Sequence, residues 1–340
     1  MTTNILNVAV VGCGKFGSKW IDILKGPNSR VVALCDSNAF ILKSAGATIP
    51  NVSLYEDYHD LVTNTSVDAV YIATPPQTHY EITKACLLSG KHVLVEKPMT
   101  KDSRLAYELF TLAQKQDCIL MVGHTYFYNR AIETILRSLD SMEIGTPRFI
   151  SFSMTNPVDI WSGKTLDSYE HIVWDLGPHV ISTICGLARS KPVSIAATAW
   201  ASIMHHTPDK RILDMIQLVL EFPGGLKATC DLKWFDYAMN RKITVFGDNG
   251  VIACENPSGR QDAVVQKRIF RLERFRLIDE SNTSERIYVG DTLERERDHF
   301  ISCVKDKLSP ITDGAQGAEV VRILEAAIAS QDAGGKRIDL

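Results

Sequence analysis

The sequence predicts an α/β protein of two domains, a doubly wound parallel sheet followed by an α+β domain with a mostly antiparallel sheet. The chain has 340 residues, more than one hydrophobic core usually spans, and 45% of them are hydrophobic. In the first third, short β-branched runs alternate with helical patterns, as in parallel strands joined by helical crossovers. After Gly123 the strand-like runs are separated by longer connections. The predicted domains are therefore residues 1–123 and 124–340.

The parallel half is predicted from apolar runs and from helical periodicity between them. The runs are Leu6–Val11, Val31–Cys35, Asp68–Ala73, His92–Val95 and Ile119–Val122. Helical periodicity fits Phe16–Leu24, Thr78–Ser89 and Ser103–Lys115, and Gly90 is a suitable helix stop.

The second half begins with a helical pattern at Ala131–Leu139 and a turn at Gly145-Thr146-Pro147. Its strand-like runs are Phe149–Met154, Val193–Trp200, Ile212–Phe222, Leu226–Trp234 and Lys242–Phe246, and two helical patterns close the chain at Leu293–Lys305 and Ala315–Ser330. The run Ile212–Phe222 is largely apolar on both faces, so we expect cover on both sides of the sheet, from helices or from another subunit. A homodimer or homotetramer through this sheet follows as a hypothesis. The charge-rich segment Arg260–Arg286 is predicted to be a solvated face.

Composition excludes several classes of function. The formal net charge of −3 provides no basic field for nucleic acid, and no apolar stretch approaches the ~20 residues needed to span a bilayer. The N-terminus Met1-Thr2-Thr3-Asn4 lacks the basic region of a secretion signal, so we expect a cytoplasmic protein. The 8 cysteines are scattered without metal-ligand spacing, which predicts reduced, buried thiols and no metal site.

The segment Gly12-Cys13-Gly14-Lys15-Phe16-Gly17 follows the first strand directly and has the spacing G-x-G-x-x-G at the start of a helix. Gly12 permits the tight turn, Gly14 lets the backbone approach a pyrophosphate, and Gly17 lets helix and strand pack. The helix N-terminus offers free N–H groups to the anion. The motif in this context predicts a Rossmann dinucleotide-binding domain, with Lys15 and Phe16 among the cofactor-binding residues.

Asp36 ends the second strand about 20 residues beyond the glycine loop, where an acidic group would bind the adenosine ribose hydroxyls. Ser37 and Asn38 follow it, with no arginine to receive a 2′-phosphate. NAD is therefore favoured over NADP, with Asp36 and Ser37 in its binding site. The alternative is that Asp36 caps the next helix.

A third strand end carries Thr74-Pro75-Pro76. The two prolines lack backbone donors and stiffen an edge where the cofactor crevice is expected, outside the carboxyl ends of the strands. We place Thr74, Pro75 and Pro76 at the cofactor. The alternative is a rigid loop in which Thr78 caps the following helix.

The pair Glu96-Lys97, followed by Pro98, comes directly after the apolar run His92–Val95. A parallel strand is buried along its length and open at its carboxyl end, so these charges are expected at the crevice where the nicotinamide ring would lie. The alternative is an exposed ion pair that only aids solubility.

These motifs, in this order, resemble the family named for glucose-fructose oxidoreductase, inositol dehydrogenase and the MocA rhizopine protein (Gfo/Idh/MocA). The resemblance covers essentially the whole chain. The matching elements are the glycine loop, Ala73-Thr74-Pro75-Pro76 with His79, Gly90–Pro98, and Trp174-Asp175-Leu176-Gly177-Pro178-His179. The resemblance implies a Rossmann domain followed by an open-faced sheet, and oxidation or reduction of a sugar or cyclitol hydroxyl. It also implies that His79, Glu96 and Lys97 belong to the cofactor site.

By position, the resemblance implies that Lys97, Asp175 and His179 are catalytic. Removal of hydride from a secondary alcohol requires the hydroxyl proton to leave, and an imidazole with a pKa of about 6.5 can accept it. His179 is then the general base, Lys97 stabilises the alkoxide, and Asp175 orients the substrate or the other two groups. The alternative is that Asp175 caps a helix with Pro178 in its first turn, while His179 faces the core or solvent.

Two positions depart from the common family pattern, namely Ser182, where many members have an aspartate, and Gly123-His124-Thr125, where many have Gly-x-Asn. This combination resembles members associated with bacterial nucleotide-sugar pathways. A nucleotide-sugar is therefore the first substrate expected, and a free sugar or cyclitol the second. Candidates for the substrate wall, each alternatively a packing residue, are Tyr126, Tyr128, Asn129, Trp161 and Tyr169. The competing class is a non-catalytic NAD-binding regulatory protein on the same fold.

Overall fold

A computed structural model of the chain describes residues 5–156, 172–201, 213–234, 239–257, 262–274 and 276–340. The chain divides into two compact units. Unit 1 comprises Met1–His124 and Leu293–Val321, and unit 2 comprises Thr125–Thr292 and Arg322–Leu340. Residues 293–321 thus return to the N-terminal unit.

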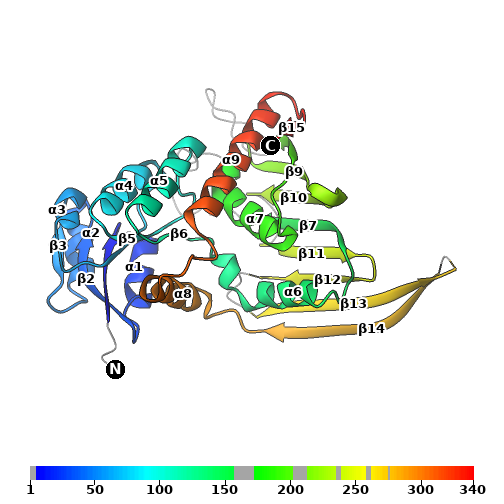
Figure 1. Cartoon of the computed structure of the whole chain (residues 1–340), viewed down its shortest axis with the longest axis horizontal. Helices are drawn as coiled ribbons and strands as arrows, with labels where there is room; N and C mark the ends of the chain where they lie inside the picture. The colour runs from blue at the N-terminus through cyan, green and yellow to red at the C-terminus, as the bar shows by residue number, and fades with distance from the viewer. Residues whose placement is uncertain (1–4, 157–171, 202–212, 235–238, 258–261, 275) are drawn as a thin grey trace. The chain divides into compact units, whose positions relative to one another are not determined.

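Unit 1 contains a parallel sheet with the strand order β3-β2-β1-β4-β5-β6 (Figure 1). Its strands are β1 (Leu6–Val11), β2 (Ser29–Cys35), β3 (Ser53–Tyr55), β4 (Ala69–Ile72), β5 (His92–Val95) and β6 (Leu120–Val122). The order reverses between β1 and β4, which is the switch point where dinucleotides bind in such sheets. The predicted Rossmann arrangement is confirmed.

Helices connect these strands and complete the unit. They are α1 (Lys15–Ile23), α2 (Ala39–Gly46), α3 (Tyr58–Val62), α4 (His79–Leu88), α5 (Ser103–Lys115), α8 (Thr292–Asp306) and the first turns of α9 (Gly314–Asp332). Helix α5 begins at an N-cap, because the Asp102 side chain accepts hydrogen bonds from the N–H groups of Arg104 and Leu105. The central strands form the core, and Val93, Leu94 and Val95 have no exposed surface. The charged segment after β5 therefore follows a strand whose last three residues are buried, as predicted.

Unit 2 contains a second sheet with the order β14-β13-β12-β11-β7-β10-β9-β8-β15. Strands β7 and β10 pair in parallel and the other neighbours are antiparallel. The strands are β7 (Pro147–Thr155), β8 (Ser194–Trp200), β9 (Met215–Glu221), β10 (Lys227–Lys233), β11 (Arg241–Gly247), β12 (Gly250–Glu255), β13 (Ala263–Glu273), β14 (Arg276–Ile287) and β15 (Ile338–Asp339). The mostly antiparallel second sheet is confirmed.

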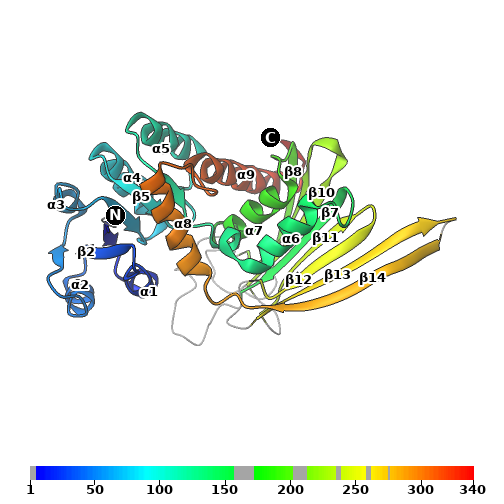
Figure 2. The same ribbon diagram turned by 60° about the horizontal axis from the view of Figure 1, so that its bottom comes forward.

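Two helices of unit 2 cover the same face of this sheet (Figure 2). Helix α7 (Ile172–Ala188) contacts β7 and β10, and α6 (Arg130–Asp140) contacts β12 and β13. On β9, Ile216, Leu218 and Leu220 are buried, whereas Gln217 and Val219 are exposed. Within the described chain, cover is therefore found on one side of β9, and cover of the other side by another subunit stays a prediction.

The charge-rich segment forms the long hairpin β13–β14, which extends beyond the rest of the sheet in unit 2 (Figure 1). Apart from Ile287, β14 is exposed along its length, and Arg268 pairs with Asp279 across the hairpin at 2.7 Å. The solvated face predicted from the sequence is confirmed, although the sequence did not reveal that this segment is a strand pair.

Candidate active site

The glycines of the loop between β1 and α1 differ in how much space a side chain would have. Gly12 has a φ of +90°, and a Cβ there would lie 2.8 Å from the backbone of Ala73. A Cβ on Gly17 would lie 1.8 Å from the carbonyl oxygen of Gly12. A Cβ on Gly14 would have no atom within 4 Å. Gly12 and Gly17 are thus required by close packing, while Gly14 borders open space of the kind that a pyrophosphate needs.

Asp36 is held in a fixed orientation by two backbone donors. Its Oδ2 accepts a hydrogen bond from the Cys13 N–H at 2.8 Å, and its Oδ1 accepts one from the Asn38 N–H at 2.9 Å. The cap of α2 is Asn38, whose side chain accepts from the N–H groups of Phe40 and Ile41. The alternative role of Asp36 as a helix cap is therefore wrong.

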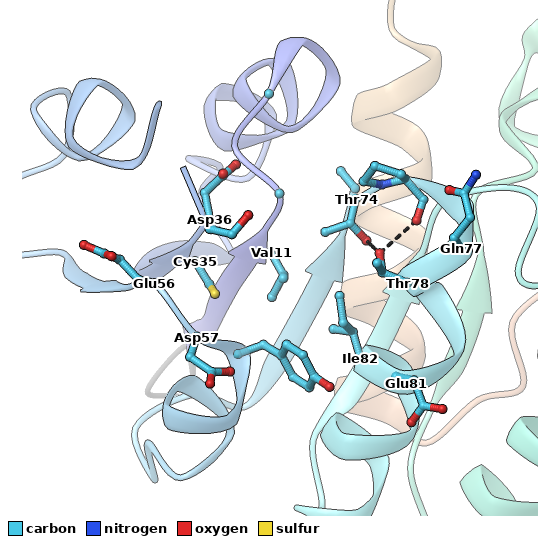
Figure 3. A pocket seen from close by; sticks show the side chains of 16 residues that line it. Val11, Cys35, Asp36, Glu56, Asp57, Thr74, Gln77, Thr78, Glu81 and Ile82 are labelled. Carbon is cyan, nitrogen blue, oxygen red and sulfur yellow. Dashed lines mark hydrogen bonds between the residues drawn. The ribbon is translucent and has the colours of Figure 1, made fainter. Parts of the chain in front are cut away.

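A pocket with a cavity volume of about 740 Å³ opens beside Asp36 at the β1/β4 switch point (Figure 3). Its walls are strand ends and the loops that follow them. The lining residues are Val11, Gly12, Gly14, Cys35, Asp36, Ser37, Glu56, Asp57, Tyr58, Ala73, Thr74, Pro75, Gln77, Thr78, Glu81 and Ile82. Six of the predicted cofactor residues are among them, namely Gly12, Gly14, Asp36, Ser37, Thr74 and Pro75. The other seven, Lys15, Phe16, Gly17, Pro76, His79, Glu96 and Lys97, do not line this pocket.

The pocket is acidic, a property that the sequence motifs did not predict. Carboxylates are contributed by Asp36, Glu56, Asp57 and Glu81, and no lysine or arginine is found among the described residues that line it. A backbone hydrogen bond from His59 lowers the pKa of Asp57. Glu56 and Asp57 enter through β3 and α3, two short elements without sequence periodicity, so no sequence signal identified them.

The loop after β4 contains internal hydrogen bonds. Thr78 Oγ1 lies 2.8 Å from both Thr74 Oγ1 and the carbonyl oxygen of Pro75 (Figure 3). Thr78 makes no side-chain cap bond to α4. The predicted capping by Thr78 is therefore wrong, but its hydroxyl holds the loop together, and Thr74 lines the pocket.

His79 connects this loop to the segment after β5. The side chain is buried, with Nε2 2.8 Å from the Thr74 carbonyl oxygen and Nδ1 2.8 Å from the Pro98 carbonyl oxygen. Burial lowers the pKa of His79 and the charge of Lys97 adds to this, while the two carbonyl contacts act in the opposite direction. Both ring nitrogens are thus occupied by protein atoms, which gives His79 a positional role between two strand-end loops.

Glu96 turns towards the interior of unit 1. The Tyr71 hydroxyl donates to Glu96 Oε1 at 2.6 Å, and Tyr71 stacks on Trp20 with ring centroids 4.4 Å apart. A Cβ on Gly123 would lie 3.1 Å from Glu96 Oε1, so a glycine at this position leaves room for the carboxylate. Burial raises the pKa of Glu96. Glu96 thus has an internal partner and is not simply a solubilising surface charge.

Lys97 is half-buried in unit 1, at the carboxyl end of β5. Its charge acts on His124, which follows β6 and is 1% exposed. Burial, reinforced by Lys97, lowers the pKa of His124 to about 3. Neither ring nitrogen of His124 has a hydrogen-bond partner among the described residues. His124 is therefore a neutral imidazole at neutral pH.

Asp175 and His179 lie one turn apart on α7 in unit 2, and both are half-buried. The indole N–H of Trp234 donates to Asp175 Oδ2 at 2.9 Å. The ring of Tyr126 packs against His179 with centroids 5.5 Å apart. Because α7 already includes Ile172, Asp175 lies inside its first turn and is not the helix cap. Trp234 follows β10 and lies 59 residues from Asp175 in the sequence, so no local pattern predicted their contact.

Gly177 in the same motif has a packing role. A Cβ on Gly177 would lie 2.5 Å from Leu324 Cδ2 of α9. This glycine therefore lets α7 and the C-terminal turns of α9 approach closely.

The candidates for a substrate wall have mixed outcomes. Tyr126 and Tyr128 are buried, each 4% exposed. Asn129 is also buried, and its side chain accepts from the Ala131 N–H to cap α6 and donates to the Pro257 carbonyl oxygen. Its described contacts are structural. Trp161 and Tyr169 lie outside the described residues.

The described residues lack a metal cluster and a membrane-spanning helix. They contain no cluster of three or more histidine, cysteine or acidic side chains able to hold a metal ion. None of their helices is both long and apolar enough to cross a membrane.

Comparisons with known proteins agree with this architecture. D-xylose 1-dehydrogenase [NADP(+)] of Haloarcula marismortui is 24% identical over 93% of this chain and 88% of that enzyme. Myo-inositol 2-dehydrogenase of Thermotoga maritima is 23% identical over 91% of this chain and 89% of that enzyme. The structure of UDP-N-acetylglucosamine 3-dehydrogenase from Acidithiobacillus ferrooxidans superposes with a TM-score of 0.80 at 20% identity, covering 96% of this chain and 98% of that one.

Two family descriptions together match most of the chain. Residues 6–124 match the oxidoreductase family with an NAD-binding Rossmann fold, and residues 132–253 match the GFO/IDH/MocA C-terminal domain. Because these two matches together cover more than half of the chain, the chain belongs to the Gfo/Idh/MocA family of oxidoreductases.

Proposed function

We propose that this chain is an NAD-dependent oxidoreductase that transfers hydride between the nicotinamide and a ring hydroxyl or ketone of a sugar. A nucleotide-sugar is the first candidate substrate, and a free sugar or an inositol-type cyclitol is the second. The names of the relatives support this range, since they designate dehydrogenases of a sugar, a cyclitol and a nucleotide-sugar.

The observation that carries the proposal is the contrast between three histidines. His79 has both ring nitrogens engaged by backbone carbonyl groups. His124 has a pKa of about 3 and is a poor proton acceptor near neutral pH. His179 is half-buried and lies one helical turn from Asp175. Of the three, His179 is the one suited to accept a hydroxyl proton.

The proposed chemistry assigns one task to each catalytic residue. NAD, when bound, supplies the hydride acceptor. His179 takes the proton of the substrate hydroxyl as the C–H bond breaks. The Lys97 ammonium group stabilises the negative charge that develops on the hydroxyl oxygen. The Asp175 carboxylate accepts a hydrogen bond from a hydroxyl of the sugar and orients the ring.

The acidic pocket supports NAD over NADP. Asp36 Oδ1 and Oδ2 are both held by backbone N–H groups, so the carboxylate is fixed where it can accept from ribose hydroxyls. A 2′-phosphate there would bring two negative charges close to Asp36, with Glu56 and Asp57 nearby in the same lining. Gly14, which has open space around it, would lie at the pyrophosphate.

The uncovered face of the second sheet supports a homodimer or homotetramer as part of the same proposal. Trp200 on β8, Val219 on β9 and Phe246 on β11 are 45%, 38% and 40% exposed. Large apolar side chains exposed on a sheet are typical of a subunit interface. Light scattering at micromolar concentration should give at least twice the chain mass, and Val219→Arg should lower it. A monomer in the unmodified protein would contradict this part.

The experiment that tests the reaction supplies NAD and a panel of nucleotide-sugars, free aldoses and inositols, and follows NADH formation. Lys97→Ala and His179→Ala should each retain less than about a tenth of the wild-type turnover, since acid–base groups contribute roughly 10²-fold or more. Lys101→Ala is the matched control, because Lys101 is another half-buried lysine four residues further along the same segment.

Two outcomes would contradict the proposal. If NAD binds but no substrate of the panel is oxidised, and no corresponding ketone is reduced with NADH, a regulatory NAD-binding protein is the better description. If either alanine variant keeps more than about a tenth of wild-type turnover, that residue has no part in the acid–base chemistry.

A further inference from the structure

We propose that Trp234 is a positioning residue for this reaction, because its indole N–H fixes the carboxylate of Asp175 on α7. The inference rests on the proposed function of Asp175 and adds a residue that the sequence motifs do not contain. The role assigned to Trp234 is to act on the reaction through Asp175.

The hydrogen bond between Trp234 and Asp175 involves a buried donor. Trp234 is 0% exposed, and its Nε1 lies 2.9 Å from Asp175 Oδ2. A buried indole N–H needs an acceptor, and a hydrogen bond to a carboxylate is roughly twice as strong as one between neutral groups. The backbone N–H of Trp234 also donates to the Asp214 carbonyl oxygen at 2.9 Å, which anchors the residue just beyond β10.

Asp175 and Trp234 are held by a helix and a strand that pack against each other. Helix α7 contacts β10, the strand that ends one residue before Trp234. Asp175 is half-buried on this helix, so part of its surface is accessible to solvent. The indole therefore holds one carboxylate oxygen and restricts the rotation of the group. A hydroxyl-bearing ring then meets a pre-oriented acceptor, which reduces the entropy lost on binding and reaction.

A purely structural role for Trp234 makes a different prediction, and Trp20 provides the comparison. Trp20 is also 0% exposed, but its Nε1 has no hydrogen-bond partner among the described residues. Trp20→Phe and Trp234→Phe both remove part of a buried indole, and phenylalanine at position 20 still stacks on Tyr71. Only Trp234→Phe also removes a hydrogen bond to Asp175.

The kinetic test compares these variants on the best substrate of the panel. Trp234→Phe should lower kcat/KM by about 10- to 100-fold, the usual loss when a group that orients a functional ligand is removed, and leave the affinity for NAD unchanged. Trp20→Phe should stay within about threefold of wild type, although it costs similar thermal stability. In an Asp175→Ala background, Trp234→Phe should cause less than a further twofold loss, because residues that act through one another are not additive.

A second measurement does not need activity. The chain has 5 tryptophans, so their indole N–H signals are resolvable by ¹H–¹⁵N NMR, and Trp234→Phe assigns one of them. That signal should move when Asp175→Ala is introduced and its exchange with solvent should quicken, while the Trp20 signal stays in place.

The outcomes separate this inference from the proposed function. If the Trp234 signal does not respond to Asp175→Ala, or if Trp234→Phe multiplies the loss in the Asp175→Ala background, the positioning role is overturned. If the signal responds but no sugar is turned over, the contact stands and the proposed reaction fails. If Trp234→Phe does not fold, the NMR comparison decides, with the Trp234 signal assigned by elimination from variants of the other tryptophans.

Discussion

Replacing Asp36 with serine should remove most of the discrimination between NAD and NADP. In the wild type, the carboxylate that accepts from Cys13 N–H and Asn38 N–H faces the pocket. Hydrogen bonds from ribose hydroxyls to a charged acceptor contribute about 1.5–3 kcal/mol, so losing them weakens NAD binding by about 10- to 100-fold.

The same substitution should improve NADP binding. At about 5 Å and an effective dielectric constant near 20, a carboxylate and one phosphate charge repel by roughly 3 kcal/mol. Salt and partial exposure reduce this figure, so we expect about a tenfold gain for NADP. The two effects together shift the NADP/NAD ratio of Kd values by at least about a hundredfold. Glu56 and Asp57 remain in the pocket and limit the gain in NADP affinity to about this size.

The assay is isothermal titration of both cofactors into wild type, Asp36→Ser and Asp60→Ser. Asp60 is the matched control, since it is an exposed aspartate on α3 that does not line the pocket. Wild type and Asp60→Ser should bind NAD at least about tenfold more tightly than NADP. The reasoning is refuted if wild type prefers NADP by that factor, or if Asp36→Ser leaves the ratio of the two Kd values within twofold of wild type.

Three further predictions concern the same unit. Gly14→Ala should fold with an unchanged Tm but lose affinity for NAD. Gly17→Ala, whose Cβ would lie 1.8 Å from a carbonyl oxygen, should lower the Tm in a thermal melt. Equal Tm values for the two variants would contradict this. Tyr71→Phe leaves the half-buried Glu96 without its 2.6 Å donor and should cost about 1–3 kcal/mol in urea unfolding; no loss would contradict that contact. The pKa of His124 is about 6.5 in the unfolded chain and about 3 in the folded protein. Protonation of the unfolded chain therefore lowers the free energy of unfolding as the pH falls below about 6.5, while above this pH the neutral imidazole costs no stability. Between about pH 7 and 5.5 the wild type should lose roughly 1.3 kcal/mol of unfolding free energy through this residue, and His124→Gln should not show this loss. Equal pH dependence of urea unfolding in the two proteins would refute the lowered pKa of His124.

The sequence predicted elements with strong periodicity and missed the weak ones. Helix α5 was predicted to the residue, because its apolar positions repeat at helical spacing. Strand β3 has three residues, none of them buried, and gives no apolar run. Strands β13 and β14 carry charge on both faces, so the alternation that identifies a half-buried strand is absent.

Some residues of the candidate site could be predicted from a local motif and others could not. Asp36 was identified because its place after a glycine loop is fixed by local geometry. Glu56 and Asp57, by contrast, reach the same pocket through the parallel pairing of β3 with β2. Trp234 reaches Asp175 through the packing of α7 on β10. Contacts of this kind depend on tertiary packing between segments that are distant in the sequence, and no motif records them.

The most direct test of the central claim follows the hydride itself. The best substrate of the panel is prepared with deuterium on the ring carbon that bears the oxidised hydroxyl, and the reduced cofactor is analysed by mass spectrometry. We expect NADH to carry one deuterium, and we expect His179→Ala to bind NAD as wild type does while it forms almost no product. NADH without deuterium, or wild-type turnover in His179→Ala, would contradict the account.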